Sequence, residues 1–250
     1  MKKDLLFILI ACFTTICLQA QDYGGFVYGV KGGLSVGTQK WNNFDKEPLF
    51  SYQGAIYIES LPADKKFSLF AQTGYHVRGS AVRNIIITNN GDQTRDTRTM
   101  NFNNVSLAAG AKQRYEVKPS TFVYYMLGLR GEYTLSSNLC SYQEVEENGY
   151  FSNGKTCPIG AFDNFIQKWN YGMILGGGVE FELAERFGFL VELSLNPDIS
   201  YQYRQPQGVR RINFTGNPSN NTTYNEQLVR NTTLELSVGI RLLRLVEYID

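Results

Sequence analysis

The chain has 250 residues, of which 43% are hydrophobic and 14% aromatic, and its formal net charge at pH 7 is +1. This length is enough for one large domain or two small ones, and the near-neutral charge gives no reason to expect a nucleic-acid partner. The 16 Tyr, 16 Phe and 24 Gly residues favour a β architecture with a crowded interior.

The N-terminus has the pattern of a cleaved signal peptide. Lys2 and Lys3 precede an apolar stretch that runs to Leu18, and cleavage after a small residue would leave Gln21 as the first mature residue. Residues 9–12 (Leu-Ile-Ala-Cys) allow lipoprotein processing as an alternative, although the apolar core would then be short. We therefore expect a signal peptide at residues 1–20 and one exported domain at residues 21–250.

Beyond the signal peptide, no apolar run approaches the roughly 18 residues that a membrane helix needs. Any crossing of a membrane must therefore use strands. Two cysteines, Cys140 and Cys157, remain after cleavage, and both fall in one predicted loop. Export to an oxidising compartment favours a disulfide between them. Two thiols without a nearby histidine are a poor zinc site, so we expect no metal and no cofactor.

Alternation of apolar and polar residues predicts eight strands, many of them long enough to cross a bilayer at a tilt. In chain order they are residues 26–37, 50–60, 67–78, 104–116, 122–135, 169–182, 187–195 and 232–242. Long stretches follow the first, third, fifth and seventh strands, and short turns follow the second, fourth and sixth. Outer-membrane barrels have this asymmetry, with short periplasmic turns and long external loops. We predict an all-β, eight-stranded, antiparallel, transmembrane up-and-down β-barrel with long extracellular loops.

The connections have distinct expected forms. Residues 62–65 (Pro-Ala-Asp-Lys) and 116–120 are predicted turns. Residues 89–92 (Asn-Asn-Gly-Asp) form a predicted hairpin turn that closes an extension of the third and fourth strands past the membrane. Residues 136–168 and 197–230 are expected to be long loops, and the second is expected to be irregular.

Two residue types indicate which face of the sheet is inside. Glycines fall repeatedly on the polar face, where small residues relieve crowding in the narrow interior of an eight-stranded barrel. Aromatic residues on the apolar face gather near both strand ends, as expected for two interfacial girdles. The girdle at the short turns comprises Phe26, Tyr28, Phe67, Tyr115, Phe181, Phe187 and Phe189, and the girdle at the long loops comprises Phe50, Tyr52, Tyr75, Tyr133, Trp169 and Tyr171. The polar face should therefore line the lumen.

The charges of this polar face are balanced. The basic residues are Lys31, Arg78, Lys112, Arg114, Arg130 and Arg241, and the acidic residues are Glu59, Glu132, Glu180, Glu182, Glu192 and Glu235. Charges in a narrow interior must pair, because an unpaired buried charge costs several kcal/mol. Equal numbers of both signs predict an interlocked polar plug, whereas a selective pore would show one sign in excess.

His76 is the only histidine, and it should point into the lumen beside Arg78, where it could pair with Glu132. No serine or aspartate at a telling spacing supports a catalytic triad, so we do not expect an enzyme. Arg204, Arg210, Arg211 and Arg230 make the last loop basic, and this loop could meet lipopolysaccharide phosphates or a partner.

The chain resembles the PorT-like family of outer-membrane β-barrels found in Bacteroidetes. The resemblance covers the whole mature chain and rests on residues 18–21 (Leu-Gln-Ala-Gln), 28–35 (Tyr-Gly-Val-Lys-Gly-Gly-Leu-Ser) and 238–241 (Val-Gly-Ile-Arg). It implies a barrel in a Gram-negative outer membrane, and the member that names the family is linked to type IX protein secretion. The chain departs from many barrels by continuing to Asp250 instead of stopping on an aromatic residue, for which Tyr248 is the nearest candidate.

These observations predict an integral outer-membrane protein with a non-enzymatic structural or interaction role. It would contact outer-membrane lipid through its apolar face, and its external loops would meet a ligand or an envelope or secretion protein. A small-solute pore, or an accessory component of type IX-like secretion, is the alternative. A lipid or peptide hydrolase using His76 is a more remote alternative.

Overall fold

The computed structural model describes residues 25–41, 46–61, 66–87, 93–139, 141–147, 150–156, 163–184, 186–211, 221–224 and 226–244. The predicted signal peptide, residues 1–20, lies outside this range, as do Cys140, Cys157 and the predicted turns at 62–65 and 89–92. No helix in the described ranges is long and apolar enough to cross a membrane.

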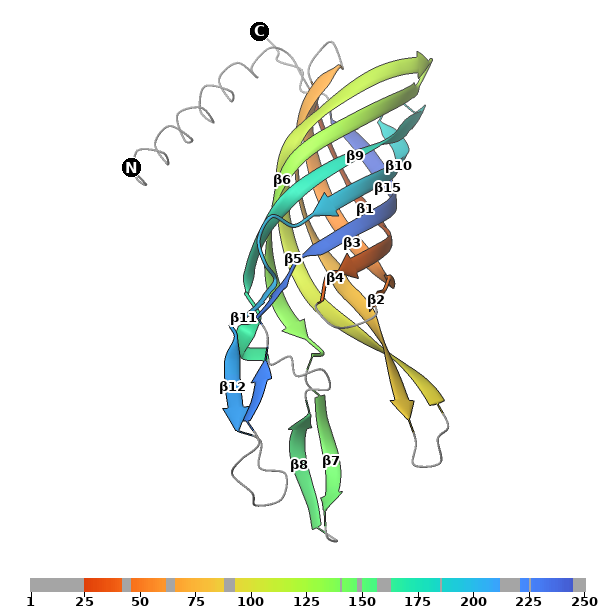
Figure 1. The fold of residues 1–250 in the computed structure, drawn as a ribbon. Coiled ribbons are helices and arrows are strands. Elements are labelled where there is room, and N and C mark those ends of the chain that lie inside the picture. The colour runs from red at the N-terminus through yellow and green to blue at the C-terminus, as the bar shows by residue number, and fades with distance from the viewer. Residues whose placement is uncertain are drawn as a thin grey trace, which may run out of the picture.

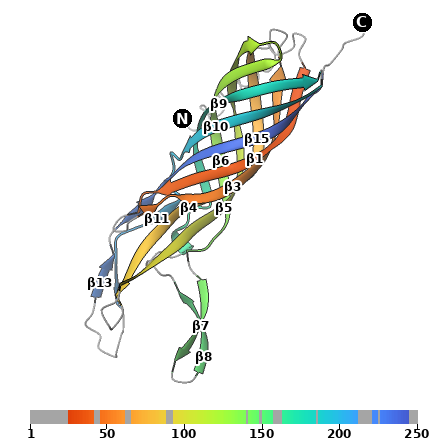
Figure 2. The same cartoon turned by 90° about the vertical axis from the view of Figure 1, so that its right-hand side faces the viewer.

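Eight long antiparallel strands form a closed barrel (Figures 1 and 2). They are β1 (Gly25–Gln39), β3 (Leu49–Leu61), β4 (Phe67–Ile87), β5 (Gln93–Lys118), β6 (Thr121–Ser137), β9 (Trp169–Ala184), β10 (Phe187–Pro197) and β15 (Asn231–Arg244). Each strand pairs with its neighbour along the chain, and β15 returns to pair with β1 from Phe26↔Arg244 to Gln39↔Asn231. The predicted eight-stranded up-and-down barrel is confirmed.

The two ends of the barrel differ as the loop lengths predicted. The short connection between β5 and β6 lies at one end, and the hairpins beyond β6 and β10 project from the other (Figure 1). The extension of β4 and β5 is confirmed, since these strands pair as far as Ile87↔Gln93. We refer to the end with the short turns as periplasmic and to the other end as outer.

The long loops contain more regular structure than their sequences indicated. β7 (Ser141–Glu147) pairs with β8 (Tyr150–Thr156), β11 (Tyr203–Gln205) with β14 (Gln227–Val229), and β12 (Gly208–Arg211) with β13 (Asn221–Tyr224). A two-residue strand, β2 (Lys46–Glu47), pairs with the extension of β4, and a short 3-10 helix, η2, spans Asp163–Phe165. The expectation that residues 197–230 are irregular was therefore wrong. Short paired strands outside the barrel need no sustained apolar alternation, which is the signal used to predict strands.

The side chains confirm which face is outside. Large apolar residues point outward and are exposed, among them Leu34 at 64%, Phe50 at 77% and Trp169 at 74%. Inward positions are polar and buried, such as Glu59 at 1% exposure and Arg78 at 0%. A soluble barrel would show the reverse, because water would drive its apolar side chains inward. The exposed apolar wall is instead suited to hydrocarbon.

A small hydrophobic core lies at the outer end of the barrel. It joins residues just beyond β1 and β6 to the outer parts of β5 and to the strands of the last loop. Its members are Trp41, Met100, Phe102, Leu139, Tyr203 and Val229, with Phe165 and Ile166 packed against them. We call this group the outer cap. It shows that part of the long loops folds back over the end of the barrel.

Candidate functional site: the interior of the barrel

The lumen holds two clusters of buried charges. The inner cluster lies on the periplasmic halves of the strands and consists of Lys31, Glu59, Lys112, Arg114, Glu180, Glu192 and Arg241, with Glu182 at its edge. The outer cluster lies nearer the outer cap and consists of His76, Arg78, Arg130, Glu132, Asp198 and Glu235.

Lys112 is central to the inner cluster. Its Nζ donates to Glu59 Oε2 and to Glu180 Oε1, both at 2.9 Å, and lies 4.1 Å from the ring centroid of Tyr124. Arg114 contacts the same two carboxylates, with its Nε 3.0 Å from Glu180 Oε2. Lys112 and Arg114, both on β5, thus share the carboxylates of Glu59 on β3 and Glu180 on β9. The four charges bind β3, β5 and β9 together across the lumen.

Further pairs join the remaining strands to this cluster. Lys31 Nζ on β1 donates to Glu192 Oε1 on β10 at 2.6 Å, and the Tyr124 hydroxyl donates to the other oxygen of Glu192 at 2.8 Å. Arg241 Nη1 on β15 lies 3.4 Å from Glu180 Oε2 and 3.3 Å from Glu182 Oε1. Charge-assisted bonds of this kind are stronger than neutral ones, and here each buried charge has a partner of opposite sign.

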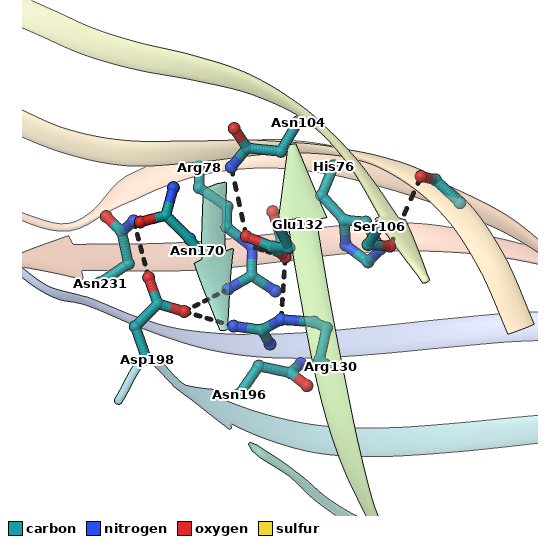
Figure 3. A network of polar contacts seen from close by, with 12 residues as sticks. His76, Arg78, Asn104, Ser106, Arg130, Glu132, Asn170, Asn196, Asp198 and Asn231 are labelled. Carbon is teal, nitrogen blue, oxygen red and sulfur yellow. Dashed lines mark hydrogen bonds and ion pairs between the residues drawn. The ribbon is translucent and has the colours of Figure 1, made fainter. Parts of the chain in front are cut away.

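Arg78 is central to the outer cluster (Figure 3). Its guanidinium is completely buried and reaches three carboxylates: Glu132 at 3.2 Å, Asp198 at 3.4 Å and Glu235 at 3.2 Å. Arg130 pairs with Asp198 and, at 2.9 Å, with Glu132. Two guanidinium groups and three carboxylates therefore meet in one buried site. Guanidinium suits this arrangement, because its planar fork of donors can serve several carboxylate oxygens at once.

His76 completes the outer cluster. Its Nδ1 lies 3.0 Å from Glu235 Oε1, whereas Glu132, the partner suggested by the sequence, contacts Arg78 and Arg130. The expected His76–Glu132 pairing was therefore wrong, because Glu235 reaches His76 across the lumen from β15. Among the described residues, His76 Nε2 has no hydrogen-bond partner, and His76 is only 3% exposed.

Buried amides connect the outer cluster to the outer cap. Asn231 Nδ2 donates to Asp198 Oδ2 at 3.1 Å, and Gln39 Nε2 donates to Asn231 Oδ1 at 2.5 Å. The indole Nε1 of Trp41, a member of the outer cap, donates to Gln39 Oε1 at 2.8 Å. These bonds form a continuous polar path from the ion pairs to the hydrophobic cap. The cap is thereby held in a fixed position over the cluster.

An apolar layer also occupies the lumen. Its members are inward-facing residues of β4, β5, β6 and β9, namely Phe70, Ala108, Tyr124, Met126 and Ile174. A cavity lined in part by Phe70, Met126 and Lys112 has a volume of about 10 Å³. This is about the space of one water molecule.

The structure brings together all ten charges that the sequence placed in a lumen network. The inner cluster holds Lys31, Lys112, Arg114, Glu180, Glu192 and Arg241, and the outer cluster holds Arg78, Arg130, Glu132 and Glu235. Glu59 is buried in the inner cluster, whereas the side chain of Glu182 is 24% exposed at its edge.

Sequence reasoning missed Asp198, which it placed in an irregular loop. The signal was present, since Glu192, Ser194 and Asn196 face inward and residue 198 continues their alternation. Within the described ranges, no group of three or more His, Cys, Asp or Glu residues is arranged to hold a metal ion.

Several solved structures are similar to the chain at low sequence identity. The chain is similar to Neisserial surface protein A, with 12% identity, coverage of 87% of this chain and 96% of that chain, and a TM-score of 0.42. It is also similar to the outer membrane protein OprG from Pseudomonas aeruginosa (10% identity, 89% and 98% coverage, TM-score 0.44) and to the outer membrane protease OmpT from Escherichia coli (10%, 88% and 96%, 0.36). No curated protein matches the chain.

The family assignment rests on the sequence itself. Residues 19–203 match the family described as "Outer membrane protein beta-barrel domain". The match spans most of the barrel, from before β1 to β11, and it agrees with the exposed apolar wall and the buried polar lumen. The chain therefore belongs to the outer membrane protein beta-barrel domain family and resides in the outer membrane.

Proposed function

We propose that this protein is a closed, non-enzymatic barrel whose lumen is plugged by its charge clusters and whose outer loops bind a ligand or an envelope protein. The observation that carries the proposal is the filling of the interior. From the outer end inward, the outer cap, the outer cluster, the apolar layer and the inner cluster occupy the lumen. A solute would have to displace paired charges, which are costly to separate in a buried site.

The outer loops project beyond the barrel and are therefore the candidate surface for binding a ligand or an envelope protein. The extended β4–β5 hairpin and the β7–β8 hairpin project well beyond the barrel (Figure 1), and β12–β13 forms a third projection (Figures 1 and 2). Paired strands give these projections defined shapes, as recognition requires. A barrel built only as a membrane plug would have no need of such structures.

The geometry around His76 supports a non-enzymatic role. A general base must reach the proton that it abstracts, directly or through one water molecule. His76 is buried beneath the outer cap, and its Nδ1 is engaged with Glu235. Glu235, which contacts His76, is also contacted by Arg78, and the buried Ser106 hydroxyl donates to Gly74 O at 3.4 Å.

Planar-bilayer recording tests the plug directly. We expect the purified full chain, reconstituted at neutral pH, to show no discrete conductance steps, because paired charges and apolar side chains occupy the lumen at successive levels. A porin inserted under the same conditions provides the positive control. Reproducible single-channel steps from this chain would contradict the plugged lumen and favour a small-solute pore.

We also propose that the chain is a PorT-like barrel of a Bacteroidetes-type envelope and that its partner is an envelope or secretion protein. The sequence segments at residues 28–35 in the first strand and 238–241 in the last strand support this family membership. Purification of the tagged protein from native membranes in mild detergent, with a loop-deleted β7–β8 variant in parallel, would test the partner. Recovery of the same proteins with both variants, or of none, would reject the loops as the binding surface.

Cys140 and Cys157 are proposed to form a disulfide at the base of the β7–β8 hairpin. The first pair of this hairpin is Ser141↔Thr156, and the cysteines are the adjacent residues in the sequence. Directly opposed residues of an antiparallel pair have Cα separations of about 4.5–5.5 Å, which a disulfide accepts. We expect maleimide-polyethylene glycol to label the exported protein only after reduction and denaturation. Labelling of two thiols without reduction would refute the disulfide, and the Cys140→Ser/Cys157→Ser variant controls for background.

A further inference from the structure

A group of cations lies beside the aromatic girdle at the outer end of the barrel. Lys168 directly precedes Trp169, the first residue of β9, and its Nζ lies 5.9 Å from the ring centroid of Tyr133. The rings of Tyr133 and Trp169 are 5.0 Å apart, and Trp169 is 74% exposed on the apolar wall. Aromatic girdles mark the level of the lipid headgroups. Lys168 therefore lies at the headgroup level of the outer leaflet.

Two further cations, Lys40 and Arg230, lie at the outer ends of the neighbouring strands β1 and β15. The last pair between β1 and β15 is Gln39↔Asn231, and both side chains point inward and are buried. Lys40 directly follows β1 and Arg230 directly precedes β15, so continued alternation of side chains turns both outward, and both are exposed. Arg230 is held in place by Tyr201, whose ring centroid lies 4.1 Å from its Cζ.

The segment before β9 and the segment after β10 bring these cations to the same side of the rim. Ile166 bridges to Tyr203, and Gln167 N donates to Gln202 O at 2.8 Å. The next residues of this antiparallel contact are Lys168 and Tyr201, the residue that carries Arg230 on its ring. Lys168, Arg230 and Lys40 thus form one stretch of the rim, which we call the rim cations.

The rim cations have no protein anion to neutralise them within the described ranges. The inner and outer clusters pair every charge that they contain, whereas none of the three rim cations makes an ion pair with a described carboxylate. Lys168 and Arg230 instead contact aromatic rings, which leave the positive charge available.

We propose that Lys40, Lys168 and Arg230 bind the phosphate groups of an outer-leaflet glycolipid. Phosphate is the anion found at headgroup level, and both ammonium and guanidinium groups bind it with charge-assisted hydrogen bonds. The exposed apolar wall directly beneath, including Tyr171 at 60% and Trp169 at 74%, contacts the acyl chains of the same lipid. This site is independent of the plugged lumen and of any partner of the loops.

Binding of a bisphosphorylated lipid A to the full chain in detergent provides the test, with the enzymatically dephosphorylated lipid as the second ligand. The variant Lys40→Gln/Lys168→Gln/Arg230→Gln removes the three charges and keeps side chains of similar polarity. A cation near an anionic surface contributes about fivefold in affinity, so we expect the triple variant to bind roughly 100-fold more weakly. Its affinity for the dephosphorylated lipid should match that of the unmodified protein.

The control variant Lys118→Gln/Arg186→Gln removes two exposed cations at the periplasmic end. It should bind the phosphorylated lipid as the unmodified protein does, and Arg230→Lys should retain most of the affinity. Heat-modifiable gel mobility confirms that each variant is a folded barrel. Equal binding by the triple variant, equal binding of both lipids by the unmodified protein, or an equal loss in the control would each overturn the proposal. If the triple variant does not fold, Tyr201→Leu, which releases Arg230, should weaken binding severalfold, and no change would likewise overturn it.

Discussion

Arg78→Met is expected to lower the free energy of unfolding by about 3–5 kcal/mol, because it removes one partner from a buried charge cluster. Arg78 is completely buried and contacts Glu132, Asp198 and Glu235. Methionine fills part of the space but cannot neutralise a carboxylate. Among the described residues, the three anions would then keep Arg130 as their guanidinium partner, and Glu235 would keep its contact with His76 Nδ1. Urea-induced unfolding in phospholipid vesicles, followed by tryptophan fluorescence, measures the change.

Two variants separate the loss of this charge from other effects. Arg186→Met removes an exposed arginine at the periplasmic turn and should change the free energy of unfolding by no more than about 0.5 kcal/mol. Adding Glu132→Gln to Arg78→Met removes one of the unpaired anions and should recover part of the lost stability. A loss of less than about 1 kcal/mol in Arg78→Met, or no recovery in the double variant, would show that the outer cluster does not stabilise the barrel.

Gly110→Ala is expected to destabilise the barrel by about 1–3 kcal/mol or more through overpacking. A Cβ at this inward position would lie 2.2 Å from Leu127 O and 2.5 Å from Gly128 Cα on the neighbouring strand. Both are backbone atoms, so the wall itself would have to move. Gly110 pairs with Gly128 in the register of β5 and β6. The close packing of these two strands therefore depends on the absence of side chains at this pair.

Gly131→Ala is the matched control, since it changes a glycine on β6 in the same pair of strands. Its added Cβ would meet nothing closer than Leu107 O at 4.0 Å, and the residue is exposed on the outer wall. We expect its free energy of unfolding to stay within about 0.5 kcal/mol of that of the unmodified protein. Similar losses in Gly110→Ala and Gly131→Ala, measured by urea titration in vesicles, would contradict the packing argument.

The hairpin of β9 and β10 shows which structural features the sequence alone could predict. Alternation along residues 169–182 and 187–195 indicated the two strands, their inward face and their connection. The structure extends them to Trp169–Ala184 and Phe187–Pro197 and pairs Val191 with Val179. The same alternation continued to Asp198, but the polar residues that follow it concealed the inward aspartate. Likewise, β12 and β13 are short and polar, and they became recognisable only through their mutual pairing.

The sequence by itself determined the number of barrel strands, their sidedness and the ends at which long and short connections lie. These features depend on neighbours along the chain: the side chains of a strand alternate every residue, and a hairpin joins successive strands. Only the tertiary structure decided which charges pair, since Lys31 and Glu192 are 161 positions apart and Lys112 and Glu180 are 68 apart. The closure and stagger of the barrel set the distances across the lumen. The same closure brings Trp41, Met100 and Tyr203 together as the outer cap, a contact that no local pattern encodes.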